Sequence, residues 1–214
     1  MAKHKSISQA VRESDQYRIR MFKSDFLEKF SYVHPLVPVF LYVPVILVSS
    51  YFAFAKFHLT PLQFAGMFLA GILGWTLTEY TLHRFLFHPP MKSEFLKKVY
   101  FYTHGIHHEA PLDATRLVMP PSVSVPLAVL VYFGVMAIWP QTGLAFYAGF
   151  ILGYLFYDML HFSTHFFAFP WKWYKLLKKH HMVHHFKAPD KNFGVSNHLW
   201  DYIFRTKYKH KSLS

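Results

Sequence analysis

The chain has 214 residues, a net charge of +12 and no cysteine; 53% of its residues are hydrophobic and only 16% are charged. An average soluble protein carries roughly 25% charged residues, so this composition is typical of a protein adapted to lipid. The lack of cysteine excludes disulfides, iron–sulfur clusters, thiolate-ligated haem, cysteine zinc fingers and a cysteine nucleophile.

Residues 1–32 are expected to form a cytosolic amino-terminal tail. They carry many charges and contain no apolar core, which excludes a cleaved secretory signal. Phe22, Phe26 and Phe30 recur every four positions, a spacing that predicts an amphipathic helix at the membrane surface. For residues 1–15 a solvated tail is an equally good interpretation. Residues 33–214 are then the membrane domain.

Four nearly uncharged apolar segments follow in two pairs. They cover residues 35–55, 62–82, 123–139 and 144–160. A helix needs about 20 residues to cross the hydrocarbon core, so the first two segments are long enough and the last two are short, tilted or partly sunken. The alternative is a soluble helical bundle. It is disfavoured because a domain of this size cannot bury four such segments.

The links between the segments predict the topology. Residues 56–61 and 140–143 are short and make two helical hairpins, and of the 23 Lys and Arg only Lys56 lies in one of them. The other 22 lie in the tail, the middle loop and the carboxy-terminal region. Because positive charge marks the cytosolic side, both termini are predicted to be cytosolic. Anionic lipid explains the basic charge without any nucleic acid.

Ten of the 16 histidines fall into four clusters, all expected at the cytosolic ends of the spans. They are His83 and His88; His104, His107 and His108; His161 and His165; and His181, His184 and His185. Clustered imidazoles repel one another when protonated and need partners when buried and neutral, so this pattern predicts metal binding. Ten ligands are too many for one ion and suit two. Imidazole accepts iron, zinc, copper or nickel.

The spacing predicts how the rings meet. Residues at i, i+3 and i+4 share a helix face, so each triplet is expected to converge on one point. His83 and His88 point about 140° apart on an ideal helix. They converge only if the helix ends or bends between them, and the following Pro89 makes an ending plausible.

Two carboxylates are well placed to support these ligands. Glu79 lies one turn before His83, and Asp158 lies three residues before His161. Each is expected to accept the second ring N–H of a ligand, although helix capping or a nearby cation would also explain them. Six histidines are left out of the ligand set: His4, His34, His58, His180, His198 and His210.

Several blocks around these residues resemble the fatty acid hydroxylase superfamily, most closely its fatty acid (sphingolipid) 2-hydroxylase branch. The blocks are Glu79-Tyr-Thr-Leu-His-Arg-Phe-Leu-Phe-His88, His104-Gly-Ile-His-His108, Gly153-Tyr-Leu-Phe-Tyr-Asp158 and Leu177-Lys-Lys-His-His-Met-Val-His-His-Phe186, then Phe193-Gly-Val195 and Leu199-Trp-Asp201. The similarity covers roughly residues 22–206. It implies an all-α integral membrane four-helix bundle, made of two helical hairpins, with a cytosolic helical cap that holds a histidine-rich di-metal site.

The resemblance also implies the chemistry. The ten clustered histidines would bind two metal ions, with iron expected and zinc found in known family structures. The enzyme would hydroxylate the C2 position of a fatty acyl chain, as a free fatty acid or a ceramide N-acyl chain, using O2 and external electrons. No His-Pro-Gly-Gly haem motif of a fused cytochrome b5 domain is present. A separate donor, cytochrome b5 or ferredoxin with its reductase, is therefore expected. The membrane would be the endoplasmic reticulum in a eukaryote or the inner membrane in a bacterium.

Two other interpretations stay open. The same fold serves sterol and carotenoid hydroxylases and lipid desaturases. A histidine-rich metal transport or sensing protein is a more distant alternative, because it predicts polar ligands inside the spans. Here the histidines gather at one end of the spans.

Overall fold

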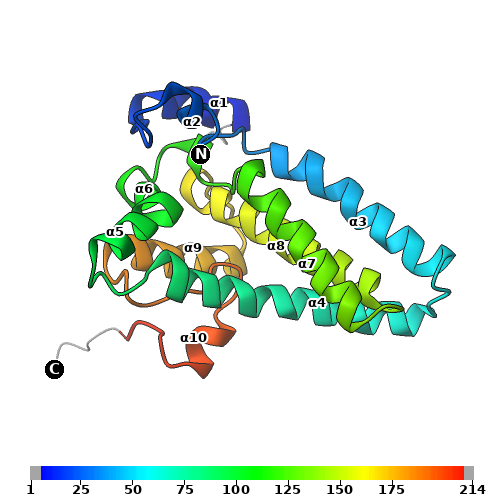
Figure 1. Ribbon diagram of the computed structural model, residues 1–214. Helices are drawn as coiled ribbons and strands as arrows, with labels where there is room; N and C mark the ends of the chain where they lie inside the picture. The colour runs from blue at the N-terminus through cyan, green and yellow to red at the C-terminus, as the bar shows by residue number, and fades with distance from the viewer. Residues whose placement is uncertain (1–5, 210–214) are drawn as a thin grey trace.

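The computed structural model describes residues 6–209, and these fold entirely into helices joined by short links (Figure 1). Four long helices form a bundle, and the shorter ones gather at one end of it. The short helices are α1 (Ile7–Ser14), η1 (Asp15–Tyr17), α2 (Asp25–Lys29), η2 (Leu82–Phe87), α5 (Glu94–Tyr100), η3 (Phe101–Gly105), α6 (Ile106–Glu109), η4 (Ala114–Arg116), α9 (Lys172–Phe186) and α10 (Leu199–Ile203).

The four long helices are α3 (Val37–Ala55), α4 (Pro61–Thr81), α7 (Pro121–Ile138) and α8 (Gly143–Phe166). Each lies in a segment long and apolar enough to cross a membrane, which confirms the predicted bundle of two hairpins. The α8 helix continues to Phe166, beyond the expected end of the fourth span at residue 160. His161 and His165 therefore lie on the helix itself and not after it.

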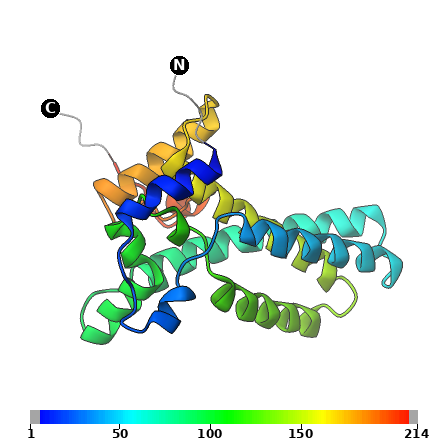
Figure 2. The same ribbon diagram turned by 90° about the horizontal axis from the view of Figure 1, so that it is seen from above.

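The α8 helix lies at the centre of the bundle (Figure 2). In its most apolar stretch 78% of the residues are buried, against 11–22% in the other three helices. The exposed faces of those helices carry large apolar side chains such as Phe40, Leu62 and Phe133. A soluble protein does not expose contiguous apolar surface on this scale, so these faces belong in lipid. The molecule is a membrane protein.

Two glycines allow α4 and α8 to cross in direct backbone contact. A Cβ added at Gly149 would lie 1.9 Å from the carbonyl oxygen of Phe68, and one added at Gly71 would lie 2.0 Å from that of Phe146. Small residues at such crossings are typical of helices that pack in membranes. The crossing fixes the register of α4 against α8. His83 follows directly after α4, and His161 lies on α8.

The amino-terminal segment packs against the end of the bundle. The α1 helix buries Ala10 against Ala114 and Leu117, so the solvated-tail interpretation is wrong for this helix. Further on, Glu28 of α2 forms a buried ion pair with Arg116 at 2.6 Å. The expected amphipathic helix is shorter than its pattern, because α2 includes only one of the three phenylalanines.

Candidate metal centre

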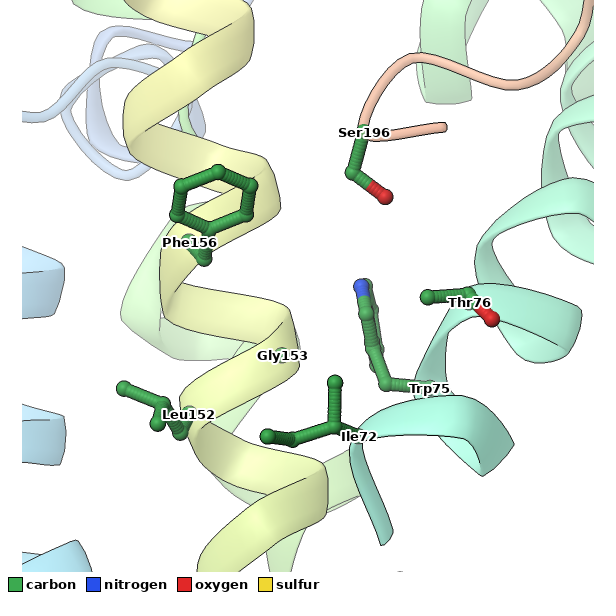
Figure 3. Close-up of a pocket in the computed structure, with 7 residues that line it drawn as sticks. All are labelled: Ile72, Trp75, Thr76, Leu152, Gly153, Phe156 and Ser196. Carbon is green, nitrogen blue, oxygen red and sulfur yellow. The ribbon is translucent and has the colours of Figure 1, made fainter. Parts of the chain in front are cut away.

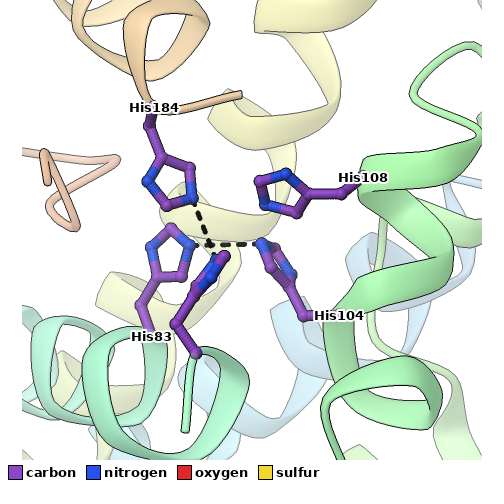
Figure 4. Close-up of side chains that lie close together, drawn as sticks. His83, His104, His108 and His184 are labelled. Carbon is purple, nitrogen blue, oxygen red and sulfur yellow. Dashed lines mark hydrogen bonds between the residues drawn. The ribbon is translucent and has the colours of Figure 1, made fainter. Parts of the chain in front are cut away.

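All ten predicted ligands come together at the cap end of the bundle, in two groups of five. The first group is His83, His88, His104, His108 and His184, and the second is His107, His161, His165, His181 and His185. Within each group, one nitrogen from every ring lies within 4.8 Å of the others. Figure 4 shows four rings of the first group converging from three parts of the chain.

A π-helical turn brings His83 and His88, which are five residues apart, onto the same side of the chain. The turn η2 spans Leu82–Phe87, and the backbone N–H of His88 donates to the carbonyl of His83 at 3.1 Å. A π turn closes i→i+5 hydrogen bonds, so residues five apart come onto one side. The predicted bend between the two histidines is therefore present as a wider turn.

Each HxxHH triplet is divided between the two groups, and the expectation that a triplet converges on one point was wrong. His104 and His108 join the first group, while His107 joins the second. On α9 the division is reversed, because His181 and His185 join the second group and His184 the first. At about 100° per residue, position i+3 lies about 60° to one side of i and i+4 about 40° to the other. A triplet between two sites therefore serves both.

The spacing of the ring nitrogens fits metal coordination. Nε2 of His107 lies 3.0 Å from Nε2 of His161 and 2.9 Å from Nε2 of His185. In the first group, Nε2 of His83 and Nε2 of His104 are 3.1 Å apart. Two imidazoles bound at about 2.1 Å and at right angles on one ion place their nitrogens about 3.0 Å apart. These separations suit neighbouring ligands of one ion.

Backbone carbonyls fix the tautomer of three of the rings. Nδ1 of His83 donates to Phe193 at 2.6 Å, Nδ1 of His161 to Leu117 at 3.1 Å, and Nδ1 of His184 to Lys191 at 2.8 Å. A carbonyl oxygen only accepts, so the proton is on Nδ1 and the lone pair is on Nε2. These three Nε2 atoms face other Nε2 atoms, an arrangement that a cation stabilises.

Burial keeps neutral the seven ligand histidines that lie in the cap, outside the membrane-spanning segments. It lowers the pKa of His88 to about 3, of His108 to about 2 and of His184 to about 4, and repulsion from neighbouring histidines adds to the effect. Burial also lowers the pKa well below the ordinary range in the remaining cap members: His104, His107, His181 and His185. Neutral rings keep the lone pairs that a metal ion needs.

The sequence predicted that Glu79 and Asp158 accept hydrogen bonds from ligand rings. In the structure, each of them accepts from backbone N–H and hydroxyl groups instead. Glu79 accepts from the backbone N–H groups of Val195 and Ser196, at 2.7 and 2.8 Å, and from the hydroxyl of Ser196. Asp158 accepts from the backbone N–H of Met119 at 3.3 Å and from the hydroxyl of Tyr154 at 3.0 Å. Each carboxylate thus holds a segment of backbone.

A buried aspartate that the sequence did not single out holds the same region. Asp201 accepts from the backbone N–H of Phe193 at 3.0 Å and of Gly194 at 2.8 Å. It also pairs with Nε2 of His180 at 2.9 Å, and His198 stacks on His180 at 3.9 Å between ring centroids. Neither histidine belongs to the two groups. The available signal was its place in the block Leu199-Trp-Asp201, which the resemblance included without giving the aspartate a role.

An apolar pocket of about 320 Å³ lies between α4 and α8 (Figure 3). It is lined by Ile72, Trp75, Thr76, Leu152, Gly153, Phe156 and Ser196. The Trp75 ring contacts Tyr157 at 5.7 Å between centroids, and Tyr157 stacks on His161 at 5.8 Å. The pocket therefore connects through aromatic contacts to the second group.

Residues 68–206, which include all ten histidines, match the family model described as fatty acid hydroxylase. The chain belongs to the fatty acid hydroxylase family. A solved structure described as full-length scs7p with only the hydroxylase domain visible has the same fold as this family member. The TM-score is 0.81 at 32% sequence identity, over 96% of this chain and 79% of that one.

Two curated relatives of this fatty acid hydroxylase family member are informative. The mouse protein named fatty acid 2-hydroxylase is 38% identical over 211 residues, covering 88% of this chain and 56% of that protein. The Arabidopsis thaliana protein named dihydroceramide fatty acyl 2-hydroxylase FAH2 is 37% identical over 198 residues, covering 87% and 79%. The chain thus spans about half the length of the mammalian relatives it matches.

Proposed function

We propose that this protein is a membrane-bound di-iron monooxygenase that hydroxylates the C2 position of a fatty acyl chain. The substrate is a free fatty acid or the N-acyl chain of a ceramide. The observation that carries the proposal is the meeting of ten neutral imidazoles in two five-membered groups at one end of four apolar helices. The names of the similar proteins supply the reaction.

Bound iron would supply the activation of O2 that hydroxylation of an unactivated C–H bond requires. Overall, one O2, two electrons and two protons convert a C2 methylene into a hydroxymethine and release one water. The five rings of each group would hold one ion, and the carbonyls of Phe193, Leu117 and Lys191 keep three of the ten rings oriented. Iron is the expected metal, but imidazole also binds zinc, so a purified sample can contain zinc in its place.

The apolar pocket gives the alkyl chain a route from the bilayer. Its lining of Ile72, Leu152 and Phe156 suits hydrocarbon, and its volume is at the low end of the roughly 300–1,000 Å³ typical of small-molecule sites. The polar end of the lipid then stays at the level of the cap, beside the histidines. A one-electron carrier, cytochrome b5 or ferredoxin with its reductase, is the expected second partner.

The orientation follows from charge. Lys56 is the one Lys or Arg in the two short hairpin links, which supports our proposal that the cap and both chain termini face the cytosol. The exposed rings of Phe26 and Phe30 support a position at the membrane surface for α2, within the proposed tail of residues 1–32. The membrane is the endoplasmic reticulum in a eukaryote or the inner membrane in a bacterium.

The proposal is tested by expressing the chain, together with the carrier and reductase, in a host that lacks 2-hydroxylated lipids. Mass spectrometry of the acyl chains is expected to find new 2-hydroxy species, which disappear in the His107→Ala variant. The matched control is His58→Asn, because His58 is exposed in a hairpin link and has a φ of 51°, which asparagine adopts readily. This variant is expected to retain activity.

Other outcomes would contradict the proposal. Unchanged lipids in the presence of an active carrier would exclude the reaction. New double bonds, or hydroxyl groups on sterols or carotenoids, would favour the other reactions of the superfamily. Metal analysis is expected to find about two ions per chain, and one or none would exclude a di-metal centre. To distinguish the two substrates, ceramide synthesis is blocked while labelled fatty acid is supplied. Continued 2-hydroxylation of the label indicates a free fatty acid as substrate, and its loss indicates the N-acyl chain of a ceramide.

A further inference from the structure

Three stacked aromatic rings, the last two of them exposed, form a ladder at the beginning of α9. The rings of Phe169 and Trp171 stack at 5.0 Å between centroids, and those of Trp171 and Trp173 stack at 5.8 Å with 7° between their planes. Trp171 is 52% exposed, Trp173 49% and Leu176, one turn later, 61%. Clustered apolar side chains of this size at a surface mark a contact with another apolar phase.

The ladder is held firmly in place. The buried Tyr174 donates its hydroxyl to the carbonyl of Ser163 in α8 at 2.7 Å, and Nζ of Lys178 donates to the carbonyl of Phe167 at 2.6 Å. Both bonds tie the first turns of α9 to the end of α8. The exposed tryptophans therefore project from a fixed base.

The charges beside the ladder are all positive. Lys172, Lys175 and Lys179 are exposed on the same part of α9, and no acidic residue occurs between Asp158 and Asp190. Tryptophan beside lysine is the combination that favours the boundary between hydrocarbon and headgroups. Basic side chains near that boundary are attracted to anionic lipid. The same charges repel a basic protein partner.

The position of the ladder agrees with this chemistry. In Figure 1 the beginning of α9 faces the four long helices, and its other end points away from them. The beginning of α9 lies against the end of α8, to which Tyr174 and Lys178 bond. A bilayer around the four apolar helices would bring its headgroups to this level.

We propose that residues 169–179 dock in the lipid headgroup layer at the cap end of the spans. Trp171 and Trp173 lie among the outermost methylenes and carbonyls of the lipids, and the three lysines bind anionic headgroups. The same helix carries His181, His184 and His185 two to four turns later. Docking of its first turns therefore sets the height of the two histidine groups above the hydrocarbon, independently of the reaction catalysed.

The experiment uses the absence of native cysteine in the chain. A single cysteine is introduced as Trp173→Cys and labelled with an environment-sensitive fluorophore, and the full chain is placed in nanodiscs. The matched control is Phe95→Cys, another exposed aromatic position. It belongs to α5, which Figure 1 shows at the end of the molecule away from the long helices. Lipid carrying a nitroxide near its headgroup is expected to quench the label at position 173 at least twofold, and aqueous iodide is expected to quench the label at position 95.

The expected result is a difference between the two positions. Equal quenching by aqueous iodide at both positions, with no lipid quenching at 173, would overturn the proposal and would indicate a protein partner for the ladder. A second comparison tests the lysines, using zwitterionic nanodiscs and nanodiscs with added phosphatidylserine. Lipid quenching at 173 is expected to increase with phosphatidylserine, and this increase should vanish when Lys172, Lys175 and Lys179 are changed to Ser. The same quenching in both lipids would overturn the role of anionic headgroups.

Discussion

Glu79 lies on α4 and His83 one turn later, in the turn η2 that follows it, and both contact the same short segment, residues 193–196. Glu79 holds the end of this segment through the backbone N–H groups of Val195 and Ser196. His83 donates Nδ1–H to the carbonyl at its beginning, on Phe193, at 2.6 Å. The carboxylate therefore orients the ring through the backbone between them.

The second group repeats this arrangement on α8. Asp158 accepts from the backbone N–H of Met119, and His161, three residues later, donates to the carbonyl of Leu117. At the end of each of these two long helices, a carboxylate and a histidine thus form hydrogen bonds with the same neighbouring segment of backbone. Partners beyond the ligands commonly change metal affinity by 10–100-fold.

The Glu79→Gln variant is expected to bind metal about tenfold more weakly in the first group, because a neutral amide oxygen is a weaker acceptor than the carboxylate for the backbone N–H groups of residues 195 and 196. The measurement is the metal content per chain during titration with a chelator. Glu94→Gln is the control, because Glu94 lies at the surface and pairs only with Lys97 among its described contacts. Equal metal loss in both variants would contradict the orienting role of Glu79.

The four-helix bundle was predictable because hydropathy and charge are local properties of the sequence. The same holds for the ten histidines, which are unusual in number and fall at regular helical spacing. Helix ends were less predictable. The α8 helix continues past Leu160, where the apolar segment ends, because the cap buries the next four residues, 161–164.

The contacts that orient the ligands were not predictable, because they join residues far apart in the chain. The pairs Glu79 with Val195 and His83 with Phe193 depend on how the carboxy-terminal segment crosses α4. Nothing in the spacing of Asp201 distinguishes a buried acceptor from a surface charge. The division of each triplet between two groups likewise required the facing helix, because both groups are built from both triplets.

Separate loss of the two ions is expected when neighbouring histidines of α9 are removed. His184→Ala removes a ligand of the first group and His181→Ala a ligand of the second, although both lie on one helix. Each variant is expected to keep about one tightly bound ion per chain, and the double variant none. The measurement is metal analysis after dialysis, with His58→Asn as the control. Loss of both ions in each single variant would indicate one shared site.

Gly149→Ala is expected to lower the free energy of unfolding by about 1–3 kcal/mol, because the new Cβ overlaps the carbonyl oxygen of Phe68. Gly134→Ala on α7 is the matched control, because a Cβ there meets no atom within 4 Å. Alanine favours helix over glycine by roughly 1 kcal/mol, so the control is expected to be neutral or stabilising. Thermal unfolding in detergent compares them, and equal destabilisation would contradict the close crossing.

The ion pair between Glu28 and Arg116 makes the packing of the amino-terminal segment depend on pH. Burial alone would raise the pKa of Glu28, but hydrogen bonds from the backbone N–H of Phe22 and from Arg116 outweigh it, and the pKa is lowered from its ordinary 4.5. A lowered pKa in the folded state means that the carboxylate stabilises the fold fully above the ordinary value. This contribution is lost as pH falls through the folded-state pKa.

Glu28→Gln is therefore expected to destabilise the segment by about 2 kcal/mol at pH 7, because it removes a charged partner from the buried Arg116. Hydrogen exchange of residues 6–32 measures this difference between the variant and the native chain. The difference should shrink as pH falls below 4.5 and vanish below the folded-state pKa, because both chains are then neutral at this position. Other groups that titrate in acid affect both chains alike, so the comparison isolates Glu28. A difference that stays constant with pH would show that the carboxylate charge does not hold the segment.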